Sequence, residues 1–517
     1  MKNRIIYIFT IFLSLSACSD DFLDLAPETS ISSASFFENE DQFNQALIGA
    51  YSNLRGVAFM GIYMDEMRSD NTFFTRYAAD RGSEASVEAI ATFQDDSFTS
   101  SQPNSAGNRY GNAYQGIAKA NTILSQLEAN KIEMDKASMD AITGEALFLR
   151  AFYYFDLVTH FGGVPLQLEE VTTEKDAFLP KNSVEDVYGQ IINDLVTAIP
   201  KLSVPTTFPQ SGRATKGAAK MLLAYAYMSK PTKDYAAAET ELRDITKMSY
   251  ALLDNYGDVF DPAQKNNQES IFEVQYKSGN EGQHSDFIWR FIPKTTNSEV
   301  ILGLRGTNLR GGITSGGWNV PTQELVDSYE TGDLRLPASI AVAEGTLDGE
   351  AFTTESVLSP VGYTPAPDKV NYYFIKKYLH PPYAVEWNTD DNWPVYRYSG
   401  ALLLLAESLV QQNRASEALP YINEVRDRAG LDDLTAVTIE DVALEMRHEL
   451  AFENHRWLDL IRFGKAIETM TAEGDRLKAI NGWLLPTSFN ITENRLIYAI
   501  PDREIQINNN LTQNIGY

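Results

Sequence analysis

Apolar residues at helical spacing recur along most of this 517-residue chain and almost stop between residues 250 and 396. In the first such segment Phe43, Leu47, Ala50 and Leu54 follow at intervals of three or four, which places them on one helix face. Segments with this spacing cover residues 39–55, 109–128, 138–160, 183–199, 214–229, 234–247, 397–412, 415–429, 439–452 and 454–470. The chain is therefore predicted to be mainly α-helical.

Three of these segments begin with a capping box, in which a Ser or Thr side chain and an acid three residues later each satisfy a backbone N–H. The pairs are Ser35 with Glu38, Ser183 with Asp186, and Thr438 with Asp441. They predict helix starts near residues 39, 184 and 439.

Two helix pairs share a layout that is typical of tetratricopeptide hairpins. Residues 214–229 and 397–412 are alanine- and leucine-rich, and each is followed after a short break by a second helical segment. Small residues let antiparallel helices approach closely. Because about 145 residues separate the two pairs, we expect helix pairs scattered through one compact fold rather than a continuous superhelix.

Residues 250–396 differ from the helical segments because they are rich in Gly, Pro, Asn, Tyr and Trp, with only short strand-like pieces such as 270–276. The glycines between 303 and 317 lack the spacing of a phosphate-binding loop. Irregular loops held by a rigid frame are where binding residues usually lie. This insertion is therefore predicted to face the ligand.

The N-terminus reads as a lipoprotein signal. Lys2 and Arg4 precede an apolar run, residues 5–17, that is too short to span a bilayer, and Cys18, the only cysteine, follows directly. A lone cysteine at this junction predicts a signal peptide over residues 1–17 and lipid attachment at Cys18, with a tether over 18–38. The segment after Cys18, Ser19-Asp20-Asp21, is acidic and resembles the export signals of lipoproteins on the outer face of a Gram-negative outer membrane.

Net charge excludes some ligands. The formal charge is −27, and loss of Lys2 and Arg4 with the signal would bring it to −29. Such an acidic body is repelled by nucleic acid and by anionic lipid. We therefore expect no nucleic-acid partner, and membrane contact through the lipid anchor alone.

No catalytic or metal-binding constellation stands out. His448 and Glu449 imitate a zinc-protease helix, but Phe452 occupies the position of the second histidine. There is no second cysteine and no G-x-S-x-G elbow. A glycosidase pair among the 70 acids stays possible, because such pairs are defined in space. We expect a protein that is not an enzyme and has no cofactor.

The tryptophans are candidates for sugar contacts. Trp457 lies among Leu458, Leu460 and Ile461 and is predicted to be in the core. The others lie in the insertion or the tail, at positions 289, 318, 387, 393 and 483. Indole rings in loops are suited to stacking on the apolar faces of sugar rings.

Five stretches, 145–166, 321–335, 419–431, 445–466 and 498–517, resemble the SusD/RagB family of outer-membrane glycan-binding lipoproteins. The resemblance implies a SusD-like fold in which embedded tetratricopeptide-like hairpins are split by a loop-rich insertion. It implies one unit over 39–517, with a helical scaffold (39–249 and 397–470), a ligand-facing region (250–396) and an irregular C-terminal segment (471–517). The stretch 445–466 is then scaffold, with Met446, Leu450, Phe452, Trp457, Leu460 and Ile461 buried and Glu449, Glu453, Arg456, Asp459 and Arg462 paired across turns or between helices.

The same resemblance implies a function. Members capture oligosaccharide outside the cell for a SusC-like TonB-dependent transporter and are not known as enzymes. By position, the implied ligand-binding residues are Asp70, Asn71, Tyr77, Arg81, Trp289 and Trp318. The alternatives are a peptide or glycopeptide binder of the same fold, a helical glycoside hydrolase, and a structural cap on the transporter.

Overall fold

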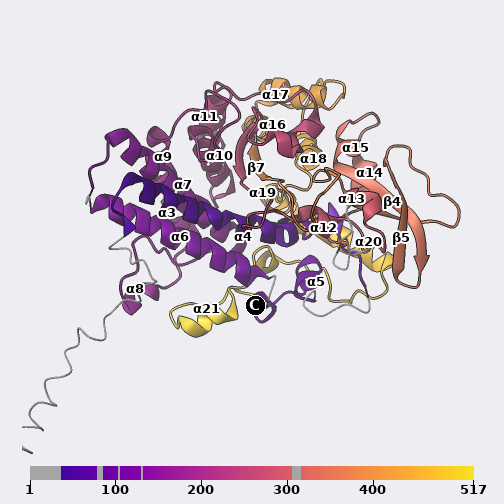
Figure 1. The fold of residues 1–517 in the computed structure, drawn as a ribbon, viewed down its shortest axis with the longest axis horizontal. Coiled ribbons are helices and arrows are strands. Elements are labelled where there is room, and N and C mark those ends of the chain that lie inside the picture. The colour runs from indigo at the N-terminus through magenta and orange to yellow at the C-terminus, as the bar shows by residue number, and fades with distance from the viewer. Residues whose placement is uncertain (1–35, 78–84, 103–104, 130–131, 305–315) are drawn as a thin grey trace, which may run out of the picture.

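The protein combines a block of long helices with a smaller region of strands and loops (Figure 1). The computed structural model describes residues 36–77, 85–102, 105–129, 132–304 and 316–517. The helices are α3 (Glu40–Ser52), α4 (Leu54–Gly61), α5 (Ala85–Ala91), α6 (Ala106–Glu128), α7 (Lys136–Phe161), α8 (Glu174–Ala177), α9 (Val184–Ala198), α10 (Lys216–Ser229), α11 (Tyr235–Ile245), α12 (Phe287–Phe291), α13 (Glu299–Leu302), α14 (Gln323–Ser328), α15 (Arg335–Ser339), α16 (Tyr398–Gln411), α17 (Ala415–Arg428), α18 (Ile439–Glu449), α19 (Arg456–Arg462), α20 (Ala466–Ile480) and α21 (Asp502–Ile507). The strands are β1 (Thr72–Phe73), β2 (Ser270–Val274), β3 (Val320–Pro321), β4 (Ile340–Asp348), β5 (Ala351–Leu358), β6 (Val370–Ile375) and β7 (Trp393–Arg397). The mainly α prediction is confirmed.

The first helix starts where predicted but with a different cap, and one predicted helix is divided. The first helix is capped by Asn39, whose side chain accepts a hydrogen bond from the N–H of Gln42, while Ser35 lies outside the described residues. The segment 454–470 is two helices, because Gly464 has a φ of +69° and ends the first of them. The capping boxes at Ser183 and Thr438 are both present.

Helix α7 forms the centre of the N-terminal helical block. It packs against α6 on one side and α9 on another, and most of its residues from Ile142 onward are buried. The helices approach so closely that a Cβ on Gly116 of α6 would lie 2.1 Å from the ring of Tyr153. Buried ion pairs join the same helices, with Arg150 of α7 on Asp194 of α9.

The two tetratricopeptide-like hairpins lie next to each other, which corrects the expectation of scattered pairs. Helices α10 and α11 form one hairpin, α16 and α17 form the other, and α11 packs on α16. Polar contacts reinforce this junction, because Glu239 accepts from Arg414 at 2.7 Å and from Gln412 at 2.9 Å. Burial of apolar faces against a neighbouring pair brings the pairs together despite the sequence between them.

Short strands connect the insertion to the helical block. In Figure 1 the sheet of β5, β4 and β6 lies at the opposite end of the molecule from α9. Strand β2 pairs with β7, which leads directly into α16. Strand β1 pairs with β3, so that Thr72 lies opposite Pro321. This last pairing places residues near 75 beside the insertion.

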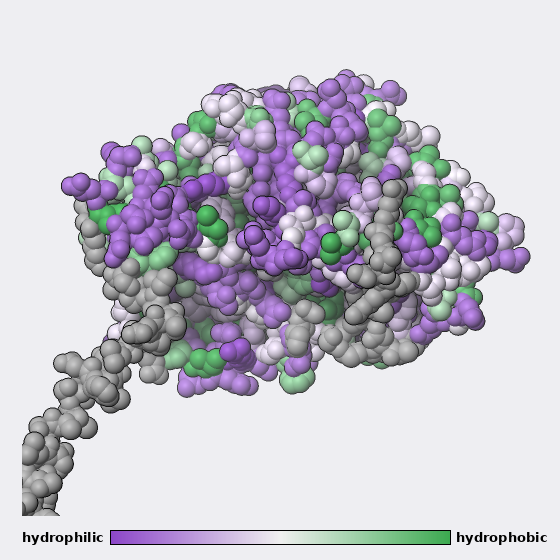
Figure 2. Space-filling model, viewed as in Figure 1, coloured by the Kyte–Doolittle hydropathy of each residue, from purple (hydrophilic) through white to green (hydrophobic). Residues whose placement is uncertain are grey.

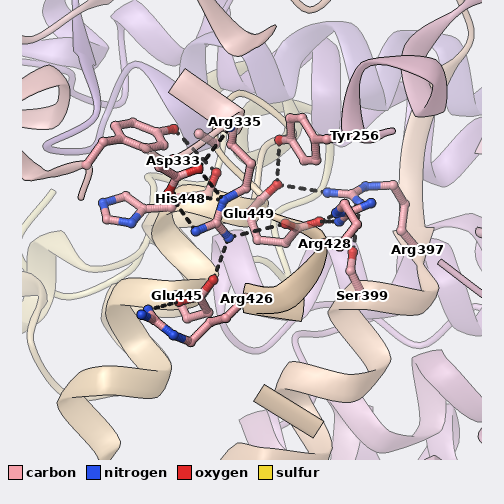
Figure 3. Close-up of polar contacts among 12 residues, drawn as sticks. Tyr256, Asp333, Arg335, Arg397, Ser399, Arg426, Arg428, Glu445, His448 and Glu449 are labelled. Carbon is pink, nitrogen blue, oxygen red and sulfur yellow. Dashed lines mark hydrogen bonds and ion pairs between the residues drawn. The ribbon is translucent and has the colours of Figure 1, made fainter. Parts of the chain in front are cut away.

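The stretch 445–466 is the internal scaffold that the sequence predicted. Trp457 is fully buried, and its ring contacts the ring of Phe93 at 5.6 Å. Four arginines from three separate segments converge on two carboxylates of α18 (Figure 3). We call this group the buried charge cluster: Arg335, Arg397, Arg426, Arg428, Glu445 and Glu449.

Pairing keeps this cluster charged inside the protein. Burial would raise the pKa of Glu449, but Arg428, Arg397 and Arg335 outweigh burial and hold that pKa well below its usual range. Each guanidinium carries several N–H donors, so one residue can satisfy two acids at once. The cluster ties α15, α17 and α18 and the strand β7 to one another.

Hydrophilic side chains predominate on the face of the molecule drawn in Figure 2, where apolar groups form only small patches. Among the described residues, no helix combines the length and apolarity needed to cross a bilayer.

Candidate ligand-binding face

Arg290 of α12 is the centre of a group of aromatic and cationic side chains at the surface of the insertion. Its guanidinium forms an ion pair with Asp286 at 2.7 Å, and its carbon Cζ lies 4.4 Å from the ring centroid of Phe59 and 5.9 Å from that of Trp387. Burial opposes the charge of Arg290, but Tyr63 and Asp286 outweigh burial and raise its pKa. The guanidinium is thus a fixed cation between two rings.

Trp387 is half-buried and rests on a rigid base. Its ring stacks on that of the fully buried Trp289, with centroids 5.8 Å apart and an interplanar angle of 28°. Its φ of +57° is uncommon for an aromatic residue and costs about 1–3 kcal/mol. Surrounding packing must therefore hold Trp387 in place, and strain of this kind is concentrated at functional sites.

Tyr77 and Lys294 extend this group along the surface. The ammonium of Lys294 lies 4.1 Å from the centroid of the Tyr77 ring, and the N–H of Lys294 donates to the Tyr77 hydroxyl at 3.2 Å. Gly317, with a φ of +84°, passes so close that a Cβ would lie 3.1 Å from that hydroxyl. We call Phe59, Tyr77, Arg290, Lys294 and Trp387 the aromatic face; all five are partly exposed.

The structure brings three of the six ligand-binding residues predicted from the sequence to this face, though two of them lie beneath it. The backbone N–H of Trp318 donates to the carbonyl of Arg290 at 2.9 Å. Trp318 and Trp289 are only 6% and 0% exposed, so their rings support the face rather than form its surface. Tyr77 is the one whose ring reaches the surface.

Asp70 and Asn71 lie apart from the aromatic face, in a buried polar group. The Asp70 carboxylate accepts from Arg456 at 2.8 and 2.9 Å, and Arg447 lies 2.9 Å away. Burial would raise the pKa of Asp70, but the two arginines outweigh it and lower the pKa to about 2. The side chain of Asn71 joins Arg447 to Glu66. This geometry favours a structural role for both residues.

Two of the predicted functional positions cannot be placed. Arg81 and the predicted lipidation site Cys18 lie outside the described residues. Both stay predictions.

Sequence reasoning did not single out Arg290, Lys294 or Phe59, and it grouped Trp387 with the other tryptophans. No local signal marks Arg290, because its partner Tyr63 is 227 residues away in the sequence. A tryptophan near the start of an Asp/Asn-rich stretch, residues 386–392, was the available signal for Trp387.

Apart from the aromatic face, a cavity of about 350 Å³ lies between α7, α10, β7 and α19. Its lining is mostly apolar and includes Phe152, Phe155 and Leu458. A sugar presents many hydroxyls that need hydrogen-bonding partners. The aromatic face, with fixed cations beside its rings, is the better match to a polar ligand.

His448, the histidine of the pattern that resembled a zinc site, is a buried residue of the protein interior. His448 is buried, stacks on Tyr329 with centroids 4.2 Å apart, and its Nε2 contacts the Ser328 hydroxyl at 2.9 Å. Burial and Arg335 hold its pKa well below the usual value, so the ring is neutral. Within the described part of the chain, no three His, Cys, Asp or Glu side chains are grouped to hold a metal ion.

Comparison with known proteins gives a consistent result. The family model described as the SusD family matches residues 268–517, and one described as starch-binding associating with the outer membrane matches residues 21–230. SusD-like protein P25 of Formosa agariphila is 27% identical over 98% of this chain and 97% of that relative. The starch-binding protein SusD of Bacteroides thetaiotaomicron is 24% identical over 78% of this chain and 76% of its own length.

Solved structures share the fold. A laminarin-binding SusD-like protein superposes with a TM-score of 0.72 at 25% identity, covering 93% of this chain and all of the other. Surface glycan-binding protein A from Bacteroides fluxus gives a TM-score of 0.74 at 23% identity, also over 93% of this chain and all of that one. The two family models divide nearly the whole chain between them, and the chain belongs to the SusD family.

Proposed function

We propose that this protein binds oligosaccharides at the surface of the outer membrane, where lipid at Cys18 anchors it, and passes them to a SusC-like TonB-dependent transporter. Relatives in the family are named for binding laminarin or starch, and one family model is described by its association with the outer membrane. Anchor, exterior location and transporter follow from the N-terminal sequence and the family resemblance.

The observation that carries the binding proposal is the aromatic face itself. Trp387 offers an exposed indole surface, and Arg290 and Lys294 stand beside the rings as hydrogen-bond donors. Stacking on an aromatic ring with donors for the hydroxyls is the chemistry that a pyranose needs. Trp289 and Trp318 are proposed to act from below by fixing Trp387 and Arg290. Asp70 and Asn71 are proposed to act only through the scaffold.

A modest affinity is enough for this role. A protein that hands its ligand to a partner needs a dissociation constant between about 1 mM and 1 μM, which corresponds to about −4 to −8 kcal/mol. Such binding requires a shaped platform and no tuned acid or base.

The test is calorimetric titration of the mature chain, without lipid, against a panel of glycans and peptides. We expect at least one oligosaccharide to bind, and Trp387→Ala and Tyr77→Ala to weaken it about tenfold or more, because a truncated central aromatic costs over 1 kcal/mol. Tyr227→Ala is the matched control: Tyr227 of α10 also packs with a lysine, Lys230 at 5.5 Å, outside the aromatic face. Binding to peptides alone, or equal losses in all three variants, would overturn the proposal.

Partner and location need separate experiments. We expect the lipidated protein to copurify with the transporter from outer membranes, and protease added to intact cells to remove it. Survival of the protein under protease would place it inside the cell.

A further inference from the structure

The loop that carries Trp387 also lines a hollow. This hollow, of about 380 Å³, is within the range of about 300–1000 Å³ that is usual for ligand pockets. Residues from three segments line it, among them Pro262, Ser278, His380, Val385, Asn388 and Asp391. Val385 at the rim is 55% exposed, so the hollow opens to solvent. We call it the Asp391 pocket.

Asp391 is the unusual residue of this pocket. Its carboxylate is only 2% exposed, and within the described part of the chain its Oδ1 accepts no hydrogen bond. His380 Nε2 lies 3.2 Å from that oxygen, but the two atoms do not form a hydrogen bond, and Nε2 has no other partner in the described chain. A buried acceptor that is left without a hydrogen bond is unfavourable. Both residues line the pocket, so a ligand hydroxyl that enters between them can supply the hydrogen bonds that they lack.

The first wall of the pocket is rigid because its own polar groups are satisfied. The N–H of His380 donates to the Tyr383 hydroxyl at 2.6 Å, and that hydroxyl donates to the carbonyl of Tyr378 at 3.0 Å. These bonds fix the turn that presents His380.

The second wall is fixed in the same way. Asn388 exchanges two hydrogen bonds with the backbone of Gly279, each at 2.8 Å. Asp390 accepts from the N–H of Ser278 at 2.6 Å. The unsatisfied groups of Asp391 and His380 are therefore held in place before any ligand arrives, which lowers the entropic cost of binding.

We propose that the Asp391 pocket binds a sugar unit through two adjacent hydroxyls, one donating to the Asp391 carboxylate and one held by His380 Nε2. A carboxylate and an imidazole nitrogen 3.2 Å apart match neighbouring hydroxyls of a pyranose. Asn388 lines the pocket and directly follows Trp387 in the chain. The pocket thus extends the aromatic face and takes a further unit of the same oligosaccharide; in that respect it rests on the proposed function.

The experiment follows the His380 ring by NMR in the full mature chain, which has five histidines. The signal is assigned from its loss in His380→Gln. Methyl α-mannoside, methyl β-glucoside, methyl β-galactoside and methyl β-xyloside are titrated to about 100 mM. We expect at least one to shift this signal saturably, and Asp391→Asn to weaken that response tenfold or more.

Thermal unfolding of the same variant separates binding from structure. Because Asp391 Oδ1 accepts no hydrogen bond within the described chain, we expect Asp391→Asn to unfold at an unchanged or higher temperature, which a structural role would not allow. Tyr227→Ala in α10, which lies outside the pocket lining, should leave the methyl glycoside response in place. If none of the four glycosides shifts the His380 signal, or if Ca²⁺ added in their place is the one addition that shifts it, the sugar assignment is overturned. Such a result would leave the proposed function untouched, because the loss of oligosaccharide binding expected in Trp387→Ala does not depend on the Asp391 pocket. The two proposals can therefore fail separately.

Discussion

Replacement of Asp70 by Asn tests whether this residue is a ligand contact or a clamp. In the structure its carboxylate joins the segment before β1 to α18 and α19 through Arg447 and Arg456. All three side chains are buried or nearly so, with exposures of 6%, 6% and 11%. An amide keeps the shape but removes the charge that both guanidiniums face.

The expected magnitude follows from the pKa of Asp70. That pKa is lowered from 3.8 to about 2, and each unit corresponds to about 1.4 kcal/mol, so ionised Asp70 contributes about 2 kcal/mol to the free energy of unfolding at pH 7. Because the folded pKa is the lower one, this contribution is present above pH 4 and is lost as pH falls toward 2. About half should remain at pH 3.

Differential scanning calorimetry of Asp70→Asn at pH 7 measures the effect. For a body of several hundred residues, the entropy of unfolding is about 1 kcal/mol per kelvin, so we expect the melting temperature to fall by about 2–3 °C. Asp433→Asn, at an exposed position, should change it by less than about 0.5 °C. An unchanged melting temperature together with weaker oligosaccharide binding would refute the clamp and restore Asp70 as a ligand contact.

Three further variants test the packing and charges of the scaffold. Gly116→Ala should lower the melting temperature, at a cost of about 1–3 kcal/mol, because the added Cβ would overlap the ring of Tyr153. In the control Gly111→Ala, in the same helix, the added Cβ meets nothing within 4 Å, so this variant should be neutral or stabilising. Calorimetry of both variants measures the difference. Burial raises the pKa of Glu66 from 4.5 to about 7, so the carboxyl destabilises the fold increasingly between these two pH values and fully above the higher one. Glu66→Gln should therefore gain about 3 kcal/mol in urea unfolding at pH 8 but almost nothing at pH 4. Equal gains at both pH values would contradict this. Trp457→Ala should lose about 3–5 kcal/mol in urea unfolding at pH 7, and a variant as stable as the parent would contradict its place in the core.

The sequence predicted the helices well wherever the signal was local. Apolar spacing located α6, α7, α16 and α17, and the capping boxes at Ser183 and Thr438 located two helix starts. The break at Gly464 was missed because a single glycine is weak evidence against a strong helical pattern. The contact between the two hairpins was missed because it depends on tertiary packing.

Residue type alone could not separate surface rings from buried ones. Trp289 and Trp387 both lie in the irregular insertion, yet one is fully buried beneath the other. What distinguishes them is the set of side chains that covers each ring, and those come from distant segments. The cation beside them, Arg290, gains its position in the same way, from Phe59 and Tyr63.

Asp70 and Asp391 show why burial by itself does not identify a binding residue. Both residues are nearly inaccessible, with 4% and 2% of their whole surface exposed. Asp70 receives two guanidiniums, and removing its charge should destabilise the protein. Asp391 Oδ1 accepts no hydrogen bond within the described chain, although His380 Nε2 lies 3.2 Å away, and we expect an amide at this position to cost no stability. The number of donors around a buried acid, rather than its depth, therefore separates scaffold from site, and opposite changes in melting temperature for the two Asn variants are the direct measure of that difference.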